Sequence, residues 1–126
     1  MELVLLQTIR VFQEKILARL GPGQGEVCMA IAEISIVPLG TGSTSVSRYV
    51  AECLKVLEAS GLSYEIHGMG TIVEGDLEAL LPVLHQMHEV PFGEGAQRVV
   101  TTIRVDDRRD KTGSAKGKVA SVKART

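Results

Sequence analysis

A chain of 126 residues with 44% hydrophobic content is long enough to form one domain around one hydrophobic core. Its 14 basic and 15 acidic residues give a formal net charge of -1, which excludes the basic surface that attracts nucleic acids and anionic membranes. Aromatic residues make up 3% with no Trp, so base-stacking platforms are also excluded, and no apolar run reaches the roughly 18–20 residues of a membrane span.

The two cysteines, Cys28 and Cys53, are too few for a disulfide framework, and their spacing matches no zinc motif. The sequence therefore predicts a protein of the reducing cytoplasm, without a metal or a resident cofactor.

Residues 1–28 are predicted to be an N-terminal extension, and residues 29–126 the domain. Apolar residues recur near helical spacing before a glycine-rich stop, which favours an amphipathic helix over a signal peptide: Leu5, Ile9, Phe12, Ile16 and Leu20. A second interpretation comes from the genetic code, since codons for Gly25-Glu26-Val27 can contain the purine-rich ribosome-binding sequence of bacteria. We hypothesise that Met29 is the native start, and that the extension is a misassigned start or an added segment.

The first half of the domain reads as strand, loop and helix. Apolar and polar residues alternate over Ala30–Val37, and Pro38 is expected to end this strand. Hydroxyl groups of the Gly/Ser/Thr loop that follows are expected to cap a helix over Val46–Ser60. Gly61 suits a left-handed end to that helix.

The second half repeats the strand and helix order. Gly68-Met69-Gly70 predicts a tight reversal between two strands, and Pro82 is expected to kink or separate the first turns of a helix over Asp76–Val90. The remaining predicted segments are strands at Ser63–Met69, Thr71–Glu74 and Arg98–Asp107, a loop over Pro91–Gly95, and a short helix near Lys116–Lys123. The sum is an α+β, ferredoxin-like β-α-β-β-α-β fold, with a four-stranded antiparallel sheet and both helices on one face.

Such a sheet leaves one face without helices, and alternation predicts which side chains it displays. These are Glu33, Ser35, Glu65, His67, Met69, Thr102 and Arg104, with Glu74 or Thr71, among the apolar Ile31, Val37 and Val100. A partly apolar, partly polar face is typical of a subunit interface that encloses a ligand, and equally of a dimer interface without one.

Other candidate chemistries have simpler interpretations. His85 and His88 could share a metal on one helix, but no third ligand is indicated and solvated histidines are favoured. Cys53 lies on an apolar stripe, which favours a buried inert thiol over a nucleophile. The loop from Gly40 to Ser43 resembles an anion cradle, yet it lacks the Lys of a phosphate loop, so capping is favoured. The charged run at 106–110 suits either solvation or ion pairs between subunits.

Several ordered runs resemble the small thiamine-binding protein family, a ferredoxin-like group. They span Ala30 to about Lys123 and read AEIS from Ala32, VPLGTG from Val37, SVS from Ser45, YVA from Tyr49, GLSYE from Gly61, MGTIVEGD from Met69, RVVTTI from Arg98 and DDRRD from Asp106. The first 28 residues have no counterpart in this resemblance.

The resemblance implies homodimers that pair into homotetramers, and binding of thiamine or its pyrimidine moiety without turnover. The residues that it points to as ligand contacts are Glu33, Ser35, Met69, Thr71 and Glu74, with Thr41 and Ser43 from the loop. A carboxylate stabilises a thiazolium cation, and hydroxyl groups in an apolar slot suit an aminopyrimidine.

One departure concerns His67-Gly68, which stands where the family usually has Thr-Pro. A neutral His67 could form a hydrogen bond with a pyrimidine, so His67 is added to the predicted ligand-binding residues. A protonated His67 would repel a thiazolium, so weaker thiamine binding is expected at acidic pH. One competing function is a structural or regulatory homo-oligomer without a dedicated ligand. The least favoured is an acid–base enzyme that uses Glu33 or Glu74, because the sequence indicates no second residue that would orient such a base.

Overall fold

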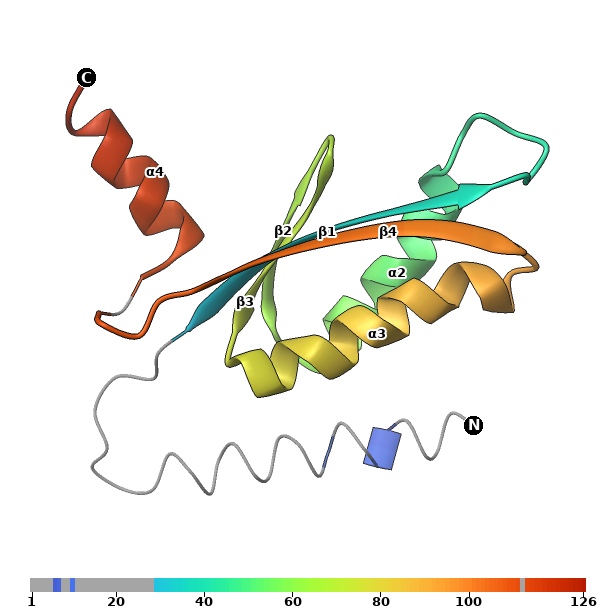
Figure 1. Cartoon of the computed structure of the whole chain (residues 1–126), viewed down its shortest axis with the longest axis horizontal. Helices are drawn as coiled ribbons and strands as arrows, with labels where there is room; N and C mark the ends of the chain where they lie inside the picture. The colour runs from blue at the N-terminus through green and yellow to red at the C-terminus, as the bar shows by residue number, and fades with distance from the viewer. Residues whose placement is uncertain (1–5, 8–9, 11–28, 112) are drawn as a thin grey trace.

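The structure is a computed structural model that describes residues 6–7, 10, 29–111 and 113–126. It confirms the predicted α+β, ferredoxin-like order and the short C-terminal helix that the sequence predicts near Lys116–Lys123 (Figure 1). The elements are β1 (Ala30–Leu39), α2 (Ser47–Ser60), β2 (Ser63–His67), β3 (Gly70–Gly75), α3 (Leu77–Gly93), β4 (Arg98–Asp107) and α4 (Ala115–Lys123). The helix predicted within residues 1–28 lies outside the described residues, except at 6–7 and 10, and the hypothesis about Met29 stays a prediction.

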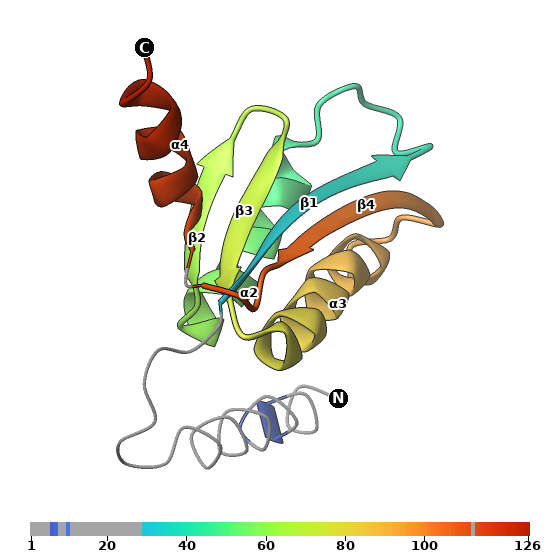
Figure 2. The ribbon, with the colours of Figure 1, turned by 60° about the vertical axis from the view of Figure 1, so that its left-hand side comes forward.

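The four strands form one antiparallel sheet in the order β2-β3-β1-β4, with α2 and α3 packed on one face (Figure 2). β1 pairs with β3 from Ala30 to Ile34, and with β4 along its whole length to Leu39. The prediction that Pro38 ends the strand is therefore wrong. Beyond Ile34 only one side of β1 has a partner strand, and a residue without an N–H is tolerated at such an edge.

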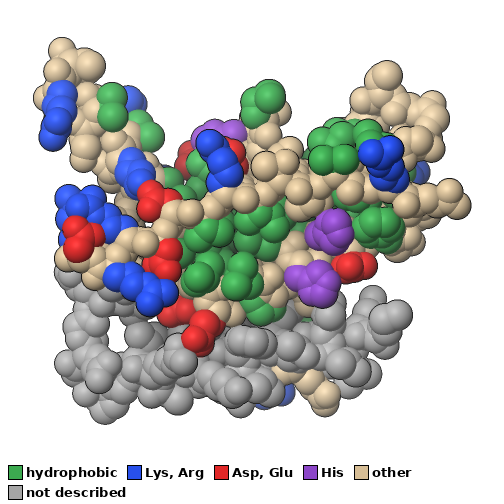
Figure 3. All heavy atoms as spheres, viewed as in Figure 1, with side chains coloured by type: hydrophobic (Ala, Val, Ile, Leu, Met, Phe, Trp, Pro, Cys, Tyr) green, Lys and Arg blue, Asp and Glu red, His purple; other side chains and the backbone are tan. Residues whose placement is uncertain are grey.

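The core lies between the helices and the covered face of the sheet. Alternate residues of β1 and β3 point into it, since Ala32, Ile34 and Val73 are buried. Leu57 of α2 and Leu80 of α3 are fully buried against them. The edge strand β4 is less covered, and Figure 3 shows hydrophobic side chains gathered along β4 and α3.

Three local predictions are corrected by the structure. Val46 is the N-cap of α2 and no side chain caps it, because the loop hydroxyl groups bond within the loop instead. α3 runs on through Pro82 without separating into two helices, and it continues through Pro91 to Gly93, where a loop was expected. Packing of Leu80, Leu84 and Met87 holds this helix together despite the hydrogen bonds that two prolines remove.

Gly61 ends α2 in the left-handed conformation that the sequence predicts, with φ of 74°. Left-handed backbone costs a residue with a Cβ about 1–2 kcal/mol, although open space surrounds this position. Gly61→Ala is therefore expected to lower the free energy of unfolding by about 1 kcal/mol in a urea titration. Gly68→Ala, at a glycine with equally open surroundings and no positive φ, is the matched control. An equal loss in both variants would contradict the conformational explanation.

Candidate functional site

The uncovered face of the sheet carries side chains from all four strands. Register and alternation place the following residues there: Ile31, Glu33, Ser35, Val37, Leu39, Ser63, Glu65, His67, Ile72, Glu74, Arg98, Val100, Thr102, Arg104 and Asp106. α2 and α3 pack on the opposite face, and on this side residues of α4 line a cavity together with residues of the sheet.

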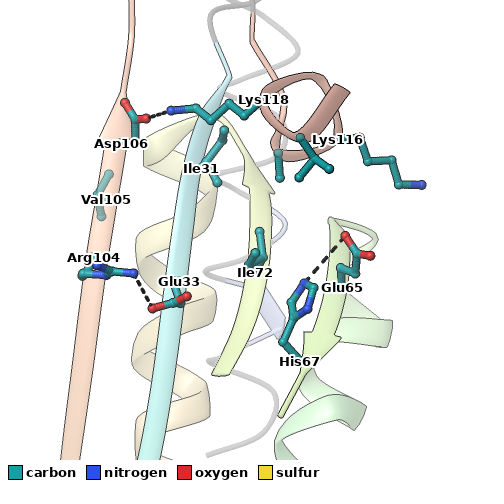
Figure 4. A pocket seen from close by; sticks show the side chains of 12 residues that line it. Ile31, Glu33, Glu65, His67, Ile72, Arg104, Val105, Asp106, Lys116 and Lys118 are labelled. Carbon is teal, nitrogen blue, oxygen red and sulfur yellow. Dashed lines mark hydrogen bonds and ion pairs between the residues drawn. The ribbon is translucent and has the colours of Figure 1, made fainter. Parts of the chain in front are cut away.

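A cavity of about 710 Å³ lies between this face and α4 (Figure 4). This volume falls within the range of small-molecule sites. Ile31 and Ile72 line its apolar part, and Val119 of α4 adds to it. We call this space the open-face cavity.

Charged side chains surround the open-face cavity in partnered arrangements. Arg104 donates to Glu33 Oε1 over 2.9 Å, linking β4 to β1. Lys118 of α4 donates to Asp106. His67 Nε2 lies 3.8 Å from Glu65 Oε2, both on β2 (Figure 4). A charged ligand in this cavity would therefore meet carboxylates and basic groups that are already paired with one another.

Hydrogen bonds hold the first turn of α4 in place, and residues further along the helix remain exposed. Ala115 N donates to Glu74 Oε1 over 2.5 Å, and the hydroxyl of Ser114 caps the helix by accepting from Gly117 N at 2.9 Å. Val119 and Val122 are 54% and 64% exposed. Glu74 thus positions α4, which forms one wall of the open-face cavity. Glu74, Glu65 and Ile72 also line a smaller adjoining pocket.

A second, smaller pocket of about 250 Å³ lies under the β2–β3 turn, beside the part of β1 that extends past β3. We call it the hairpin pocket. Its walls are mostly apolar and include Tyr49 and Leu54 of α2 and Ile36 of β1. His67 borders both the hairpin pocket and the open-face cavity.

The structure divides the predicted site residues between these two spaces. Glu33 and His67 line the open-face cavity, whereas Ser35, Met69, Thr71 and again His67 line the hairpin pocket. Thr41 and Ser43 line neither, since they bond within their own loop.

Two of these positions differ from the predicted display on the uncovered face. β2 ends at His67, so Met69 lies in the turn itself and is 89% exposed. Thr71 pairs with Ile34 and faces the helices, where it is 7% exposed. A two-residue turn without a bulge sets this register and leaves Glu74, not Thr71, on the uncovered face.

Sequence reasoning missed the contribution of α4. Ala115, Lys116, Lys118 and Val119 line the open-face cavity, whereas the sequence predicts a short helix here without placing it beside the sheet. The signal that could have indicated it is Val119 and Val122, three residues apart on one side of a short helix.

The remaining candidates follow their simpler interpretations. Cys53 is buried, its Sγ donates to the carbonyl of Met87 over 3.4 Å, and burial raises the pKa of the thiol to about 11. His85 lies exposed 3.4 Å from Glu89, and His88 shares a 2.7 Å hydrogen bond with Thr101. In the described part of the chain, no three His, Cys, Asp or Glu side chains gather as a metal site would require.

The charged run at 106–110 forms ion pairs within the chain. Arg109 pairs with Asp107 at 2.8 Å, and Arg108 pairs with Asp110, which lowers the pKa of that carboxyl to about 2. Among the described residues, no helix combines the length and apolar character that crossing a bilayer requires.

Together these features define the class of protein: a ferredoxin-like α+β domain whose open sheet face and hairpin enclose spaces of small-molecule size. Comparison with known proteins identifies the family. The chain belongs to the thiamine-binding protein family, whose model matches residues 32–123.

Relatives and a solved structure match the same region. The chain is 47% identical to the UPF0045 protein YqgV of Bacillus subtilis over 98 residues, covering 75% of this chain and 94% of that protein. It is 45% identical over 96 residues to a UPF0045 protein of Methanothermobacter thermautotrophicus, covering 75% and 97%. The crystal structure of protein MJ1052 from Methanocaldococcus jannaschii superposes with a TM-score of 0.69 at 33% identity, covering 77% of this chain and 98% of that one.

Proposed function

We propose that this protein is a cytoplasmic, non-enzymatic binder of a small molecule of the thiamine class, working as a homo-oligomer. The observation that carries the proposal is the open-face cavity of about 710 Å³, in a chain of the thiamine-binding protein family. Its apolar residues suit the rings of such a ligand, and the carboxylates of Glu33 and Glu65 suit a thiazolium cation.

An apolar patch at the other end of the uncovered face supports the homo-oligomer. Val37 and Val100 are cross-strand partners that are 39% and 47% exposed, and Leu39 beside them is 38% exposed. Three exposed aliphatic side chains in one patch are typical of a surface that a second subunit covers. A homodimer through this face, and a homotetramer built from two such dimers, would leave the ligand close to a subunit interface.

Calorimetry with thiamine tests the ligand, and native mass spectrometry with and without thiamine tests the assembly. Saturable binding to an oligomer at a fixed ratio per subunit is the expected result. An oligomer that binds no thiamine would instead support a structural or regulatory homo-oligomer. A monomer that binds thiamine would keep the ligand and remove the interface from the proposal.

Thiamine binding is expected to weaken as the pH falls from about 8 to about 5.5. A protonated His67 would neutralise Glu65, 3.8 Å away, and would repel the thiazolium. Titrations at both pH values on the wild type and on His67→Asn check this, with His85→Asn as the exposed control. Affinity that does not depend on pH in the wild type would remove His67 from the site.

A further inference from the structure

We propose that a further pocket beside α4 holds the phosphate group of a phosphorylated small molecule, whose organic part occupies the open-face cavity. We call it the basic pocket, after the four cationic side chains that line it: Arg108, Lys111, Lys118 and Arg125. The organic part rests on the proposed function, since it would be the thiamine-class ligand. The phosphate site depends only on charge and geometry.

Positive charge is concentrated in the C-terminal segment of the chain. Residues 104–126 contain eight of the 14 basic residues and three of the 15 acidic ones, although the whole chain carries a formal net charge of -1. Figure 3 shows Lys and Arg side chains gathered around α4 and the end of β4. The charge balance of the whole chain does not reveal this local excess, which favours an anionic ligand.

Two segments bring the cations around one space of about 570 Å³. Arg108 and Lys111 come from the segment that follows β4. Lys118 of α4 and Arg125 just beyond its end are two helical turns apart, so they lie on the same side, and the hydroxyl of Ser121 lies between them. The volume falls within the range of small-molecule sites, so the arrangement suits a small anion with several acceptor oxygens.

The ion pairs of this region leave an excess of positive charge. Arg108 pairs with Asp110, and Lys118 pairs with Asp106. Lys111 and Arg125 form no ion pair with a carboxylate of the described residues.

This excess matches a phosphate better than a carboxylate. With both carboxylates counted, the basic groups around the pocket exceed the acidic ones by two. A phosphate monoester carries about −1.5 to −2 charges near pH 7 and has three strong acceptor oxygens, whereas a carboxylate brings one charge and two oxygens. The charge of the pocket therefore selects the phosphorylated form of a ligand.

The basic pocket adjoins the open-face cavity. Ile31, Asp106 and Lys118 line both spaces. Figure 4 shows the ion pair between the last two at the end of the open-face cavity away from Glu33 and Glu65. One ligand can therefore place a cationic ring near these two carboxylates and its phosphate in the basic pocket. Opposite charges at its two ends would fix its orientation.

Calorimetry on the full chain with thiamine, thiamine monophosphate and inorganic phosphate tests the inference. At about pH 8 and about 0.15 M salt, the monophosphate is expected to bind at least about tenfold more tightly than thiamine, because charge-assisted hydrogen bonds to phosphate are the strong ones. Higher salt should shrink this margin. Amide NMR shifts at residues 106–111 and 117–125, caused by the monophosphate and not by thiamine, are the second expected result.

Lys111→Gln combined with Arg125→Gln removes the two cations that have no carboxylate partner. One exposed ion pair contributes only a few-fold to affinity, so the double variant should weaken binding of the monophosphate about tenfold and change thiamine affinity less than about twofold. Lys55→Gln combined with Lys123→Gln is the matched control, because it removes the same charge from exposed positions that line neither space. It should change both affinities less than about twofold.

The outcomes separate this inference from the proposed function. Equal affinity for thiamine and its monophosphate, or a preference for the monophosphate that the double variant retains, would overturn the inference and leave the proposed function standing. Equal affinity for the monophosphate and inorganic phosphate, without binding of thiamine, would contradict the proposed function and support the basic pocket as a site for free phosphate. Binding of none of the three would overturn both.

Discussion

Leu80→Ala is expected to lower the free energy of unfolding by about 2–5 kcal/mol, the largest stability effect that we predict for a single substitution. Leu80 is 0% exposed and packs from α3 against the core beside Leu84 and Val73. The truncation removes buried methyl groups and leaves a cavity between two rigid layers that cannot close around it. Chemical denaturation followed by circular dichroism measures the change.

Leu81→Ala is the matched control, since the neighbouring side chain on the same helix is 50% exposed. This substitution removes the same atoms and changes helix propensity equally. The loss of unfolding free energy should stay below about 1 kcal/mol, because half of the Leu81 side chain is already exposed to water. Equal losses in the two variants would mean that α3 contributes through its backbone and not through the face that we assign to the core.

The contrast between Leu80 and Leu81 also shows why the fold could be predicted from the sequence. Alternation over Ala30–Val37 and the apolar stripe of α2 each specify one buried face, and a shift by one residue would expose that face to water. Such patterns depend only on neighbours in the chain. Gly61 is equally local, since a helix end needs a residue that tolerates positive φ.

The predictions that were wrong depend on partners distant in sequence. Pro38 continues β1 because β4 pairs with it, and Pro82 and Pro91 stay within α3 because the core holds that helix. The placement of Thr71 depended on whether the turn at Gly68-Met69 contains an extra residue, which composition does not specify. The contribution of α4 depends on a hydrogen bond from the backbone N–H of Ala115 to the Glu74 carboxylate, 41 residues apart.

The same limit applies to the site. The sequence indicates that Glu33 and His67 share a face of the sheet, and in the structure both line the open-face cavity. It could not show that Glu33 is paired with Arg104, since that contact joins residues 71 positions apart. This pairing matters for function, because a carboxylate held beside a guanidinium attracts a cation less than a free one does.

Glu33→Arg is expected to weaken thiamine binding about 10- to 100-fold, the largest binding effect that we predict. The substitution replaces a cavity carboxylate with a second cation beside Arg104, which lies 2.9 Å from Glu33 in the wild type. Attraction of a thiazolium thereby becomes repulsion, and charges separated by about 8 Å at an effective dielectric constant of about 20 interact by about 2 kcal/mol. Calorimetry at about 0.15 M salt measures the change, and lower salt should enlarge it.

Two controls assign the loss to the cavity. Glu58→Arg changes the net charge of the chain equally from an exposed position on α2, so it should leave thiamine affinity within about twofold. The neutral pyrimidine moiety should bind Glu33→Arg as it binds the wild type, because a neutral ring gains and loses no net charge interaction. Unchanged thiamine affinity in Glu33→Arg would remove this carboxylate from the site. If the pyrimidine moiety also bound Glu33→Arg more weakly, the new arginine would instead be disturbing the sheet, because a change of charge alone should not affect a neutral ring.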